Sequence, residues 1–155
     1  MSMSRRLRLA VSAALLAAPL ALPATLHAAP RQDDVVRVRT ADPVMLAARA
    51  KARAGLDRFF ARLAAPGAED NGFSLKFDLN HRHPERGEGE IIWARQVTAE
   101  GGRIYGVLDN RPQTQGFTIG ERVEIPYDAI TDWAIRRGDK FEGHYSTRAL
   151  YPEAG

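Results

Sequence analysis

The chain contains no cysteine among its 155 residues. This absence excludes disulfide bonds, zinc sites built from thiolates and cysteine nucleophiles. The sequence also lacks a glycine-rich phosphate loop, a dinucleotide-binding fingerprint and the G-x-S-x-G turn of many hydrolases. It shows no internal repeat and no alternation of strands with helices, which argues against a parallel α/β fold. We therefore predict no catalytic residue and no cofactor.

The first residues carry the pattern of a secretory signal peptide. Residues 9–22 are almost entirely apolar and carry no charge, and a basic segment with three arginines precedes them. Small residues suited to cleavage follow at His27–Pro30. This order of basic, apolar and small residues is typical of exported proteins, and the apolar run is shorter than the ~20 residues that span a bilayer. We expect a signal peptide over residues 1–28, cleavage after Ala28, no stable membrane span afterwards, and a periplasmic or secreted product.

The net charge depends on whether the signal peptide is counted. The full chain has 22 basic and 19 acidic residues, a formal charge of +3. The signal peptide holds three arginines and no acid, so the mature chain has 19 residues of each sign and is neutral. Proteins that bind nucleic acid usually carry a basic patch and a basic overall charge. The sequence therefore predicts no nucleic-acid partner.

After cleavage, the sequence predicts a linker over residues 29–41 and a single domain over residues 42–152. The domain opens with Asp42-Pro43, an N-cap acid followed by proline at the first helical position. Apolar residues then recur at helical spacing until Ala64–Gly67, where proline and glycine end the helix. We expect one amphipathic helix whose apolar face packs on a sheet. The residues expected at that contact are Phe59, Phe60 and Leu63.

The rest of the domain has the pattern of strands. Phe73–Leu79 alternates apolar and polar residues, as a half-buried strand does. Further strands are expected at residues 90–97, 103–108, 122–125, 133–136 and 140–145. Because short turns connect the strands, they should pair antiparallel. The predicted class is α+β: an N-terminal amphipathic helix packed on a strongly curved antiparallel sheet, or small open β-barrel, of about five to six strands.

Five short motifs follow one another between about Phe73 and Leu150. They are Glu90–Trp93, Gly106–Pro112, Gly120–Val123, Ile130–Trp133 and Gly143–Arg148. In this order and spacing they resemble the YegJ-like bacterial family, domain of unknown function 2314 (DUF2314). That family often has histidine after the glutamate of the first motif, where this chain has Ile91. The resemblance implies a small bacterial domain and supplies no activity.

One cluster within these motifs combines flat aromatic side chains with hydrogen-bonding ones. Its members are Trp93, Asn110, Pro112, Asp132, Trp133, Tyr145 and Arg148. Aromatic rings give contact area at low entropic cost, and polar groups fix the orientation of a ligand. We expect the polar members to converge at the surface over a tryptophan, with Asp132 and Arg148 joined by a hydrogen bond. The same residues could instead hold the fold, with the tryptophans in the core.

The function favoured by the sequence is a non-enzymatic binding module for an envelope protein or a small ligand. Two other functions stay open. Asp132, His144 and Ser146 could form the centre of a hydrolase or transferase, because a hydroxyl nucleophile needs a base and a group that orients it. His81 and His83 would point the same way on an extended segment and could share a metal ion. No third ligand is evident, so no metal site is predicted.

Overall fold

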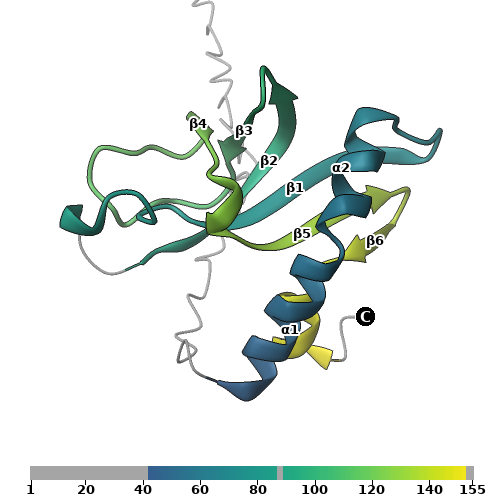
Figure 1. The fold of residues 1–155 in the computed structure, drawn as a ribbon, viewed down its shortest axis with the longest axis horizontal. Coiled ribbons are helices and arrows are strands. Elements are labelled where there is room, and N and C mark those ends of the chain that lie inside the picture. Colours follow the sequence, from purple (N-terminus) through teal and green to yellow (C-terminus); the bar gives the residue numbers. More distant parts are fainter. Residues whose placement is uncertain (1–41, 87–88, 153–155) are drawn as a thin grey trace, which may run out of the picture. The chain divides into compact units, whose positions relative to one another are not determined.

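The computed structural model describes residues 42–86 and 89–152, which belong to one compact unit (Figure 1). The predicted signal peptide and linker lie outside the described residues. The described part combines three α-helices with a six-stranded sheet, so the predicted α+β class is confirmed. No helix of the described part is long and apolar enough to cross a membrane.

The six strands pair antiparallel in the order β4-β3-β2-β1-β5-β6. Their bounds are β1 Asp70–Asp78, β2 Ile91–Glu100, β3 Arg103–Leu108, β4 Arg122–Glu124, β5 Ile130–Arg137 and β6 Lys140–Gly143. Each predicted strand overlaps one of these, because alternation of apolar and polar residues marks a strand with one buried face. The sheet is open, with β4 and β6 at its edges, and does not close into a barrel.

The N-terminal segment forms two helices where the sequence predicted one. α1 spans Pro43–Ala54 and α2 spans Leu56–Ala64. The N-cap is Asp42, whose Oδ1 accepts the backbone N–H two residues further on at 2.8 Å. The break falls at Gly55, where a β-carbon would lie 2.7 Å from Cζ2 of Trp133. The junction passes so close to this ring that only glycine fits.

The core lies on the face of the sheet that bears Leu75 and Phe77, both buried. α2 lies over this face and contributes Phe59, which is also buried. The ring of Phe59 meets those of Phe73 and Trp133, with centroids 5.8 and 5.7 Å apart. Burial of these large rings supplies much of the hydrophobic stabilisation of the domain.

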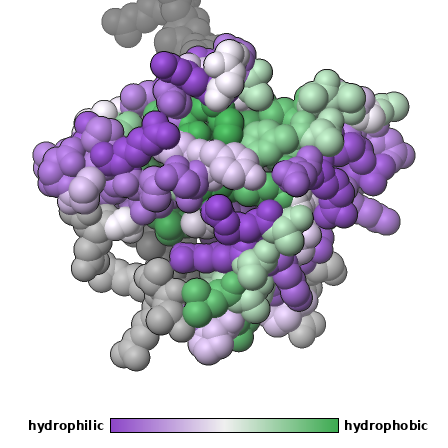
Figure 2. Space-filling view, in the orientation of Figure 1, coloured by the Kyte–Doolittle hydropathy of each residue, from purple (hydrophilic) through white to green (hydrophobic). Residues whose placement is uncertain are grey.

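The other two predicted contact residues of this segment, Phe60 and Leu63, are partly buried and pack against the core. In the space-filling view, apolar side chains gather near the centre, and polar ones surround them (Figure 2). The Phe60 ring lies beside that of Tyr127, with centroids 5.9 Å apart. Tyr127 begins the short 3₁₀ helix η2, Tyr127–Ala129, and is 49% exposed. Phe59, rather than Phe60, is therefore the fully buried ring of the segment.

A third helix, α3 Tyr145–Leu150, replaces the end of the predicted sixth strand. β6 ends at Gly143, whose φ of 80° is left-handed, and His144 follows with a φ of 59°. A β-carbon at Gly143 would collide with the carbonyl group and the ring of Trp133. These two left-handed residues turn the chain out of the sheet and into the helix.

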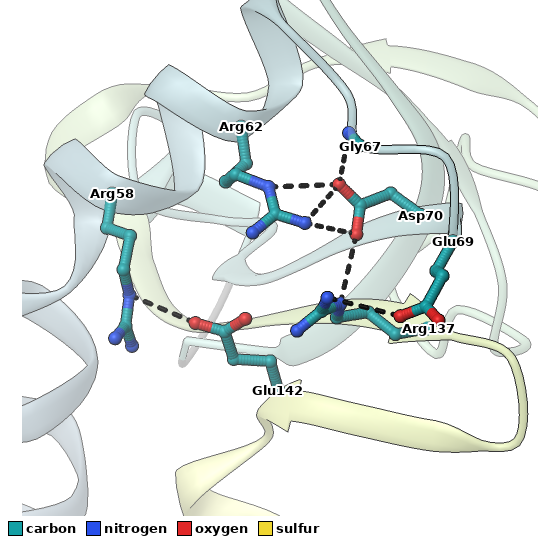
Figure 3. A network of polar contacts seen from close by, with 7 residues as sticks. All are labelled: Arg58, Arg62, Gly67, Glu69, Asp70, Arg137 and Glu142. Carbon is teal, nitrogen blue, oxygen red and sulfur yellow. Dashed lines mark hydrogen bonds and ion pairs between the residues drawn. The ribbon is translucent and has the colours of Figure 1, made fainter.

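A network of charged side chains ties α2 to β1 and β5 (Figure 3). Asp70 at the start of β1 accepts hydrogen bonds from Arg62 Nε at 2.9 Å and from the Gly67 N–H at 2.7 Å. Arg137 at the end of β5 lies 3.4 Å from the same carboxylate. These donors, Arg62 above all, hold the pKa of Asp70 below its ordinary value. Its contribution to stability is therefore present above the unfolded pKa and lost as the pH falls through the folded one.

Candidate functional site

Three paired residues, Trp93, Lys76 and Asp132, form a row across the middle of the sheet on the face opposite the core, which we call the polar row. The register places Lys76 of β1 beside Trp93 of β2 on one side and beside Asp132 of β5 on the other. Directly paired residues of antiparallel strands point to the same face. Because Leu75 and Phe77 point into the core, Lys76 between them points to the other face. The sequence suggested Trp93 and Asp132 as site residues. The register places Lys76, which the sequence did not suggest, between them.

Asp132 is fully buried and holds the start of α3. Its Oδ1 accepts the backbone N–H of Trp133 at 2.8 Å and that of Tyr145 at 3.2 Å. Its Oδ2 accepts both the backbone N–H and the hydroxyl of Ser146, each at 2.6 Å. The N-cap residue His144 makes no side-chain cap bond. The carboxylate from β5 therefore satisfies the first N–H groups of the helix in its place.

Trp133 belongs to the core and forms no floor for a surface site. It is 0% exposed, and its indole N–H donates to the Ala52 carbonyl at 2.9 Å. Gly55 and Gly143 both leave room for its ring. The Tyr145 ring packs edge to face on it, with centroids 5.7 Å apart. Two residues that the sequence suggested for binding, Trp133 and Tyr145, thus take part in packing.

Three aromatic side chains, Trp93, His144 and Phe141, form an aromatic strip over the polar row. The His144 ring lies 5.1 Å from that of Trp93 and 5.3 Å from that of Phe141, centroid to centroid. His144 follows β6, and the sheet order places β1 and β5 between it and Trp93. The two rings therefore meet above the strands where Lys76 lies. Phe141 is 46% exposed and Trp93 is partly exposed, so solvent reaches the strip.

Lys76 is partly buried beneath this strip. Its Nζ lies 5.5 Å from the centroid of the Trp93 ring, within the range of a cation–π contact, and donates to Ser146 Oγ at 3.2 Å. Burial lowers the pKa of Lys76, the Asp132 carboxylate offsets part of this effect, and the charge of Arg49 adds to it. Lys76 therefore releases its proton more readily than an exposed lysine.

Burial also lowers the pKa of His144. The Asp132 carboxylate opposes this shift, while the charges of Lys76 and Arg148 add to it. Because the ordinary pKa of histidine, about 6.5, is already below neutrality, the ring is uncharged at neutral pH. A neutral ring contacts other rings without the cost of desolvating a charge. The strip thus presents uncharged rings with cationic groups beside them.

The remaining suggested site residues have other positions. Asn110 accepts the backbone N–H of Trp93 at 3.1 Å through its Oδ1, so it fixes the loop after β3 to β2. Arg148 is exposed and donates to the Phe141 carbonyl at 2.6 Å, at the edge of the aromatic strip. The predicted hydrogen bond between Asp132 and Arg148 is wrong, because the buried carboxylate is occupied by donors from the start of α3.

Asp132, His144 and Ser146 are neighbours but do not form the hydrogen-bonded chain of a catalytic triad. A triad places the histidine between the carboxylate and the hydroxyl. Here the Ser146 hydroxyl donates directly to Asp132, and the His144 ring packs between two aromatic rings. Ser146 is only 4% exposed. The alternative of a hydrolase or transferase at these three residues therefore lacks both the geometry and access to the hydroxyl.

His81 and His83 do not converge on a common point. His81 Nε2 lies 2.9 Å from Asp128 Oδ2, whereas His83 Nδ1 lies 3.1 Å from Glu85 Oε1. The segment is not an extended strand, since it runs into the short 3₁₀ helix η1, Pro84–Arg86. Within residues 42–86 and 89–152, no three His, Cys, Asp or Glu side chains are grouped to hold a metal ion. This geometry gives the alternative of a metal-binding protein no support.

Comparison with known proteins provides a family and no activity. The model of a family described as "Uncharacterized protein conserved in bacteria (DUF2314)" matches residues 42–154. A curated relative, "Uncharacterized protein YegJ" of Escherichia coli (strain K12), is 33% identical over 73 residues, which are 44% of this chain and 48% of that protein. The alignment thus spans about half the length of this relative. No solved structure matches the chain.

Proposed function

Since the chain belongs to the bacterial DUF2314 family, which is described only as uncharacterized, we propose from its own sequence and geometry that it is an exported, non-enzymatic binding module. Its ligand is a small anion that carries a flat ring. The ring stacks on the aromatic strip of Trp93, His144 and Phe141, and the anionic group faces Lys76 and Arg148. The observation that carries this proposal is the partly buried side chain of Lys76, whose amino group lies over the ring of Trp93, which itself contacts the His144 ring.

The aromatic strip favours a flat ligand. His144 meets Trp93 edge to face and lies tilted against Phe141, at centroid separations of 5.1 and 5.3 Å. Rings at such spacing offer a rigid apolar surface, on which a further ring gains contact area at low entropic cost. Phe141 is nearly half exposed, although aromatic side chains gain most from burial. A bound ring would remove this apolar surface from water.

The charges around the strip favour an anion. Lys76, Arg49 and Arg148 each act on this region. The opposing carboxylate, Asp132, is buried and already accepts hydrogen bonds from four donors. Arg148 donates to a carbonyl group and, within the part of the chain that the structure describes, pairs with no carboxylate. An anionic group beside the strip would therefore meet more positive than negative charge, because three cationic groups lie near one buried carboxylate.

Benzoate tests this site directly, because it joins one flat ring to one carboxylate. We expect a dissociation constant on the order of 1 mM, which suits a ligand of this size. In a ¹⁵N NMR titration, it should shift the amide resonances of Lys76, Trp93 and His144. Lys76→Gln removes the charge but keeps a polar side chain, and it should weaken binding about tenfold, as the loss of one charged hydrogen bond does.

Lys51→Gln is the matched control, because Lys51 is an exposed lysine of α1, away from the aromatic strip. Its affinity for benzoate should equal that of the wild type. Acetate lacks the ring and benzyl alcohol lacks the charge, so neither should bind as well as benzoate. Equal weakening in both lysine variants, or shifts confined to residues remote from the strip, would contradict the proposed site.

The export part of the proposal rests on the basic, apolar and small-residue segments over residues 1–28. We expect the protein isolated from its native host to lack this segment and to begin at Ala29 or Pro30. N-terminal sequencing of the purified protein measures this directly. An intact Met1 on protein from the cytoplasmic fraction would contradict export and leave the ligand site untouched.

A further inference from the structure

We propose that Lys76 is a nucleophilic amine that captures a carbonyl group of the bound ligand as an imine. This inference rests on the proposed function, because it needs a ligand on the aromatic strip. It adds a carbonyl group to the chemistry of that ligand and a reversible covalent bond to the mode of binding. Its basis is the presence of lysine at this position, the surroundings of the amine and the hydrogen bonds that lead away from it.

The chain uses arginine for most of its positive charges. Of its 22 basic residues, three are lysines: Lys51, Lys76 and Lys140. Lys51 and Lys140 are exposed, whereas Lys76 is partly buried in the centre of the sheet. Arginine binds anions well but stays protonated, while a buried lysine can lose its proton and attack a carbonyl carbon. Lysine at this position fits a reaction that arginine cannot perform.

Burial raises the share of the Lys76 amine that is neutral. The Trp93 ring covers one side of the side chain, and burial together with the charge of Arg49 lowers the pKa. Asp132 offsets part of the effect. An exposed lysine with a pKa of about 10.4 is almost wholly protonated at neutral pH and is then no nucleophile. Lys76 has a larger share of the reactive form.

A short chain of hydrogen bonds leads from the amine to a buried carboxylate. Lys76 Nζ donates to Ser146 Oγ at 3.2 Å, and the Ser146 hydroxyl donates to Asp132 Oδ2 at 2.6 Å. Both bonds run in the same direction, so a proton that leaves the amine can pass through the hydroxyl to the carboxylate. Ser146 thereby orients the amine as well as giving its proton a path.

The reaction balances without a further reactant. The lone pair of Lys76 Nζ attacks the carbonyl carbon, while one amine proton is lost and the carbonyl oxygen gains one, which gives a carbinolamine. The remaining N–H proton and the hydroxyl group then leave as water, and a C=N bond forms. One water is released for each imine, and nothing is oxidised or reduced. Hydrolysis reverses both steps and returns the free lysine and the carbonyl compound.

The probe 4-formylbenzoate, which adds an aldehyde to benzoate, tests this on the mature protein; its carboxylate would face Arg148 and its aldehyde, at the opposite end of the ring, would face Lys76. Cyanoborohydride converts imines to stable secondary amines, and peptide mass spectrometry then separates the three lysines from the N-terminal amine. At pH 7 we expect Lys76 to be labelled several-fold faster than Lys51 or Lys140, because a lowered pKa leaves a larger share of its amine unprotonated. The difference should shrink as the pH rises, because the exposed lysines then lose their protons too.

The benzoate titration separates this inference from the site on which it rests. Equal labelling rates at the three lysines, with benzoate still bound, would overturn the imine and leave the proposed site intact. Failure of benzoate both to bind and to slow the labelling of Lys76 would remove the site itself. Lys76→Arg keeps a positive charge at this position but removes the primary amine that forms the imine. Labelling at this position should disappear in the same variant.

Discussion

Replacing Trp133 with alanine should lower the free energy of unfolding by about 3–5 kcal/mol, the range for a fully buried tryptophan. The indole is 0% exposed and lies against Gly55 and Gly143. Its removal leaves a cavity beside Phe59 and takes the indole donor from the Ala52 carbonyl. The junction between α1 and α2 and the junction between β6 and α3 then lose the ring against which they pack. Urea unfolding followed by circular dichroism measures the loss.

Trp93 is the matched control, since it is the other tryptophan of the chain and is only partly buried. Trp93→Ala should cost less than about half as much stability as Trp133→Ala, because less apolar surface leaves the interior. The same change should abolish benzoate binding. Equal losses of stability in the two variants would mean that the aromatic strip is part of the core, and its role as a binding surface would have to be abandoned.

The strands could be predicted from the sequence because each has one buried face, which leaves an alternating pattern. The predicted strand Phe73–Leu79 thus corresponds to β1 within a few residues. The break between α1 and α2 could not be predicted in the same way. It depends on the closeness of Gly55 to Trp133, which belongs to a strand far along the chain. Helical periodicity carries no information about such a contact.

α3 was missed for a related reason. The segment after Gly143 contains aromatic and β-branched residues, so its composition favours a strand. The helix exists because two left-handed residues turn the chain and because Asp132 caps the new N-terminus. Both causes require the tertiary structure. The last motif, Gly143–Arg148, is therefore explained largely by folding: glycine gives room for Trp133, and Ser146 joins the cap.

The suggested binding residues occupy different surroundings. Trp93 and Arg148 lie at the aromatic strip, whereas Asp132 and Trp133 are buried. The sequence pattern does not indicate a site role for Lys76, because a lysine at a polar position of an alternating strand is normally solvated. It is partly buried because the Trp93 ring of β2 lies beside its amino group, which also donates to Ser146 of α3. That arrangement follows from strand order, which the sequence pattern does not specify.

Replacing Asp132 with alanine should lower the free energy of unfolding by about 3 kcal/mol or more. A buried donor left without an acceptor costs about 1–3 kcal/mol. The carboxylate accepts from the backbone of Trp133 and Tyr145 and from both the N–H and the hydroxyl of Ser146. Its removal also leaves α3 without a side-chain cap, because His144 supplies none. The loss should appear as a lower urea midpoint and a lower melting temperature.

Asp132→Asn distinguishes a structural carboxylate from one that serves the ligand. The amide keeps one accepting oxygen but presents an NH₂ group to donors. Asp132→Asn should therefore lower the free energy of unfolding by less than Asp132→Ala does. Asp109→Asn is the control, since Asp109 is exposed and pairs with Arg95 at 2.9 Å, and such a pair contributes about 0–1 kcal/mol. Where Asp132→Asn remains folded, benzoate should still bind through Lys76. A normal melting temperature combined with lost binding would instead return Asp132 to the ligand site, as the sequence first suggested.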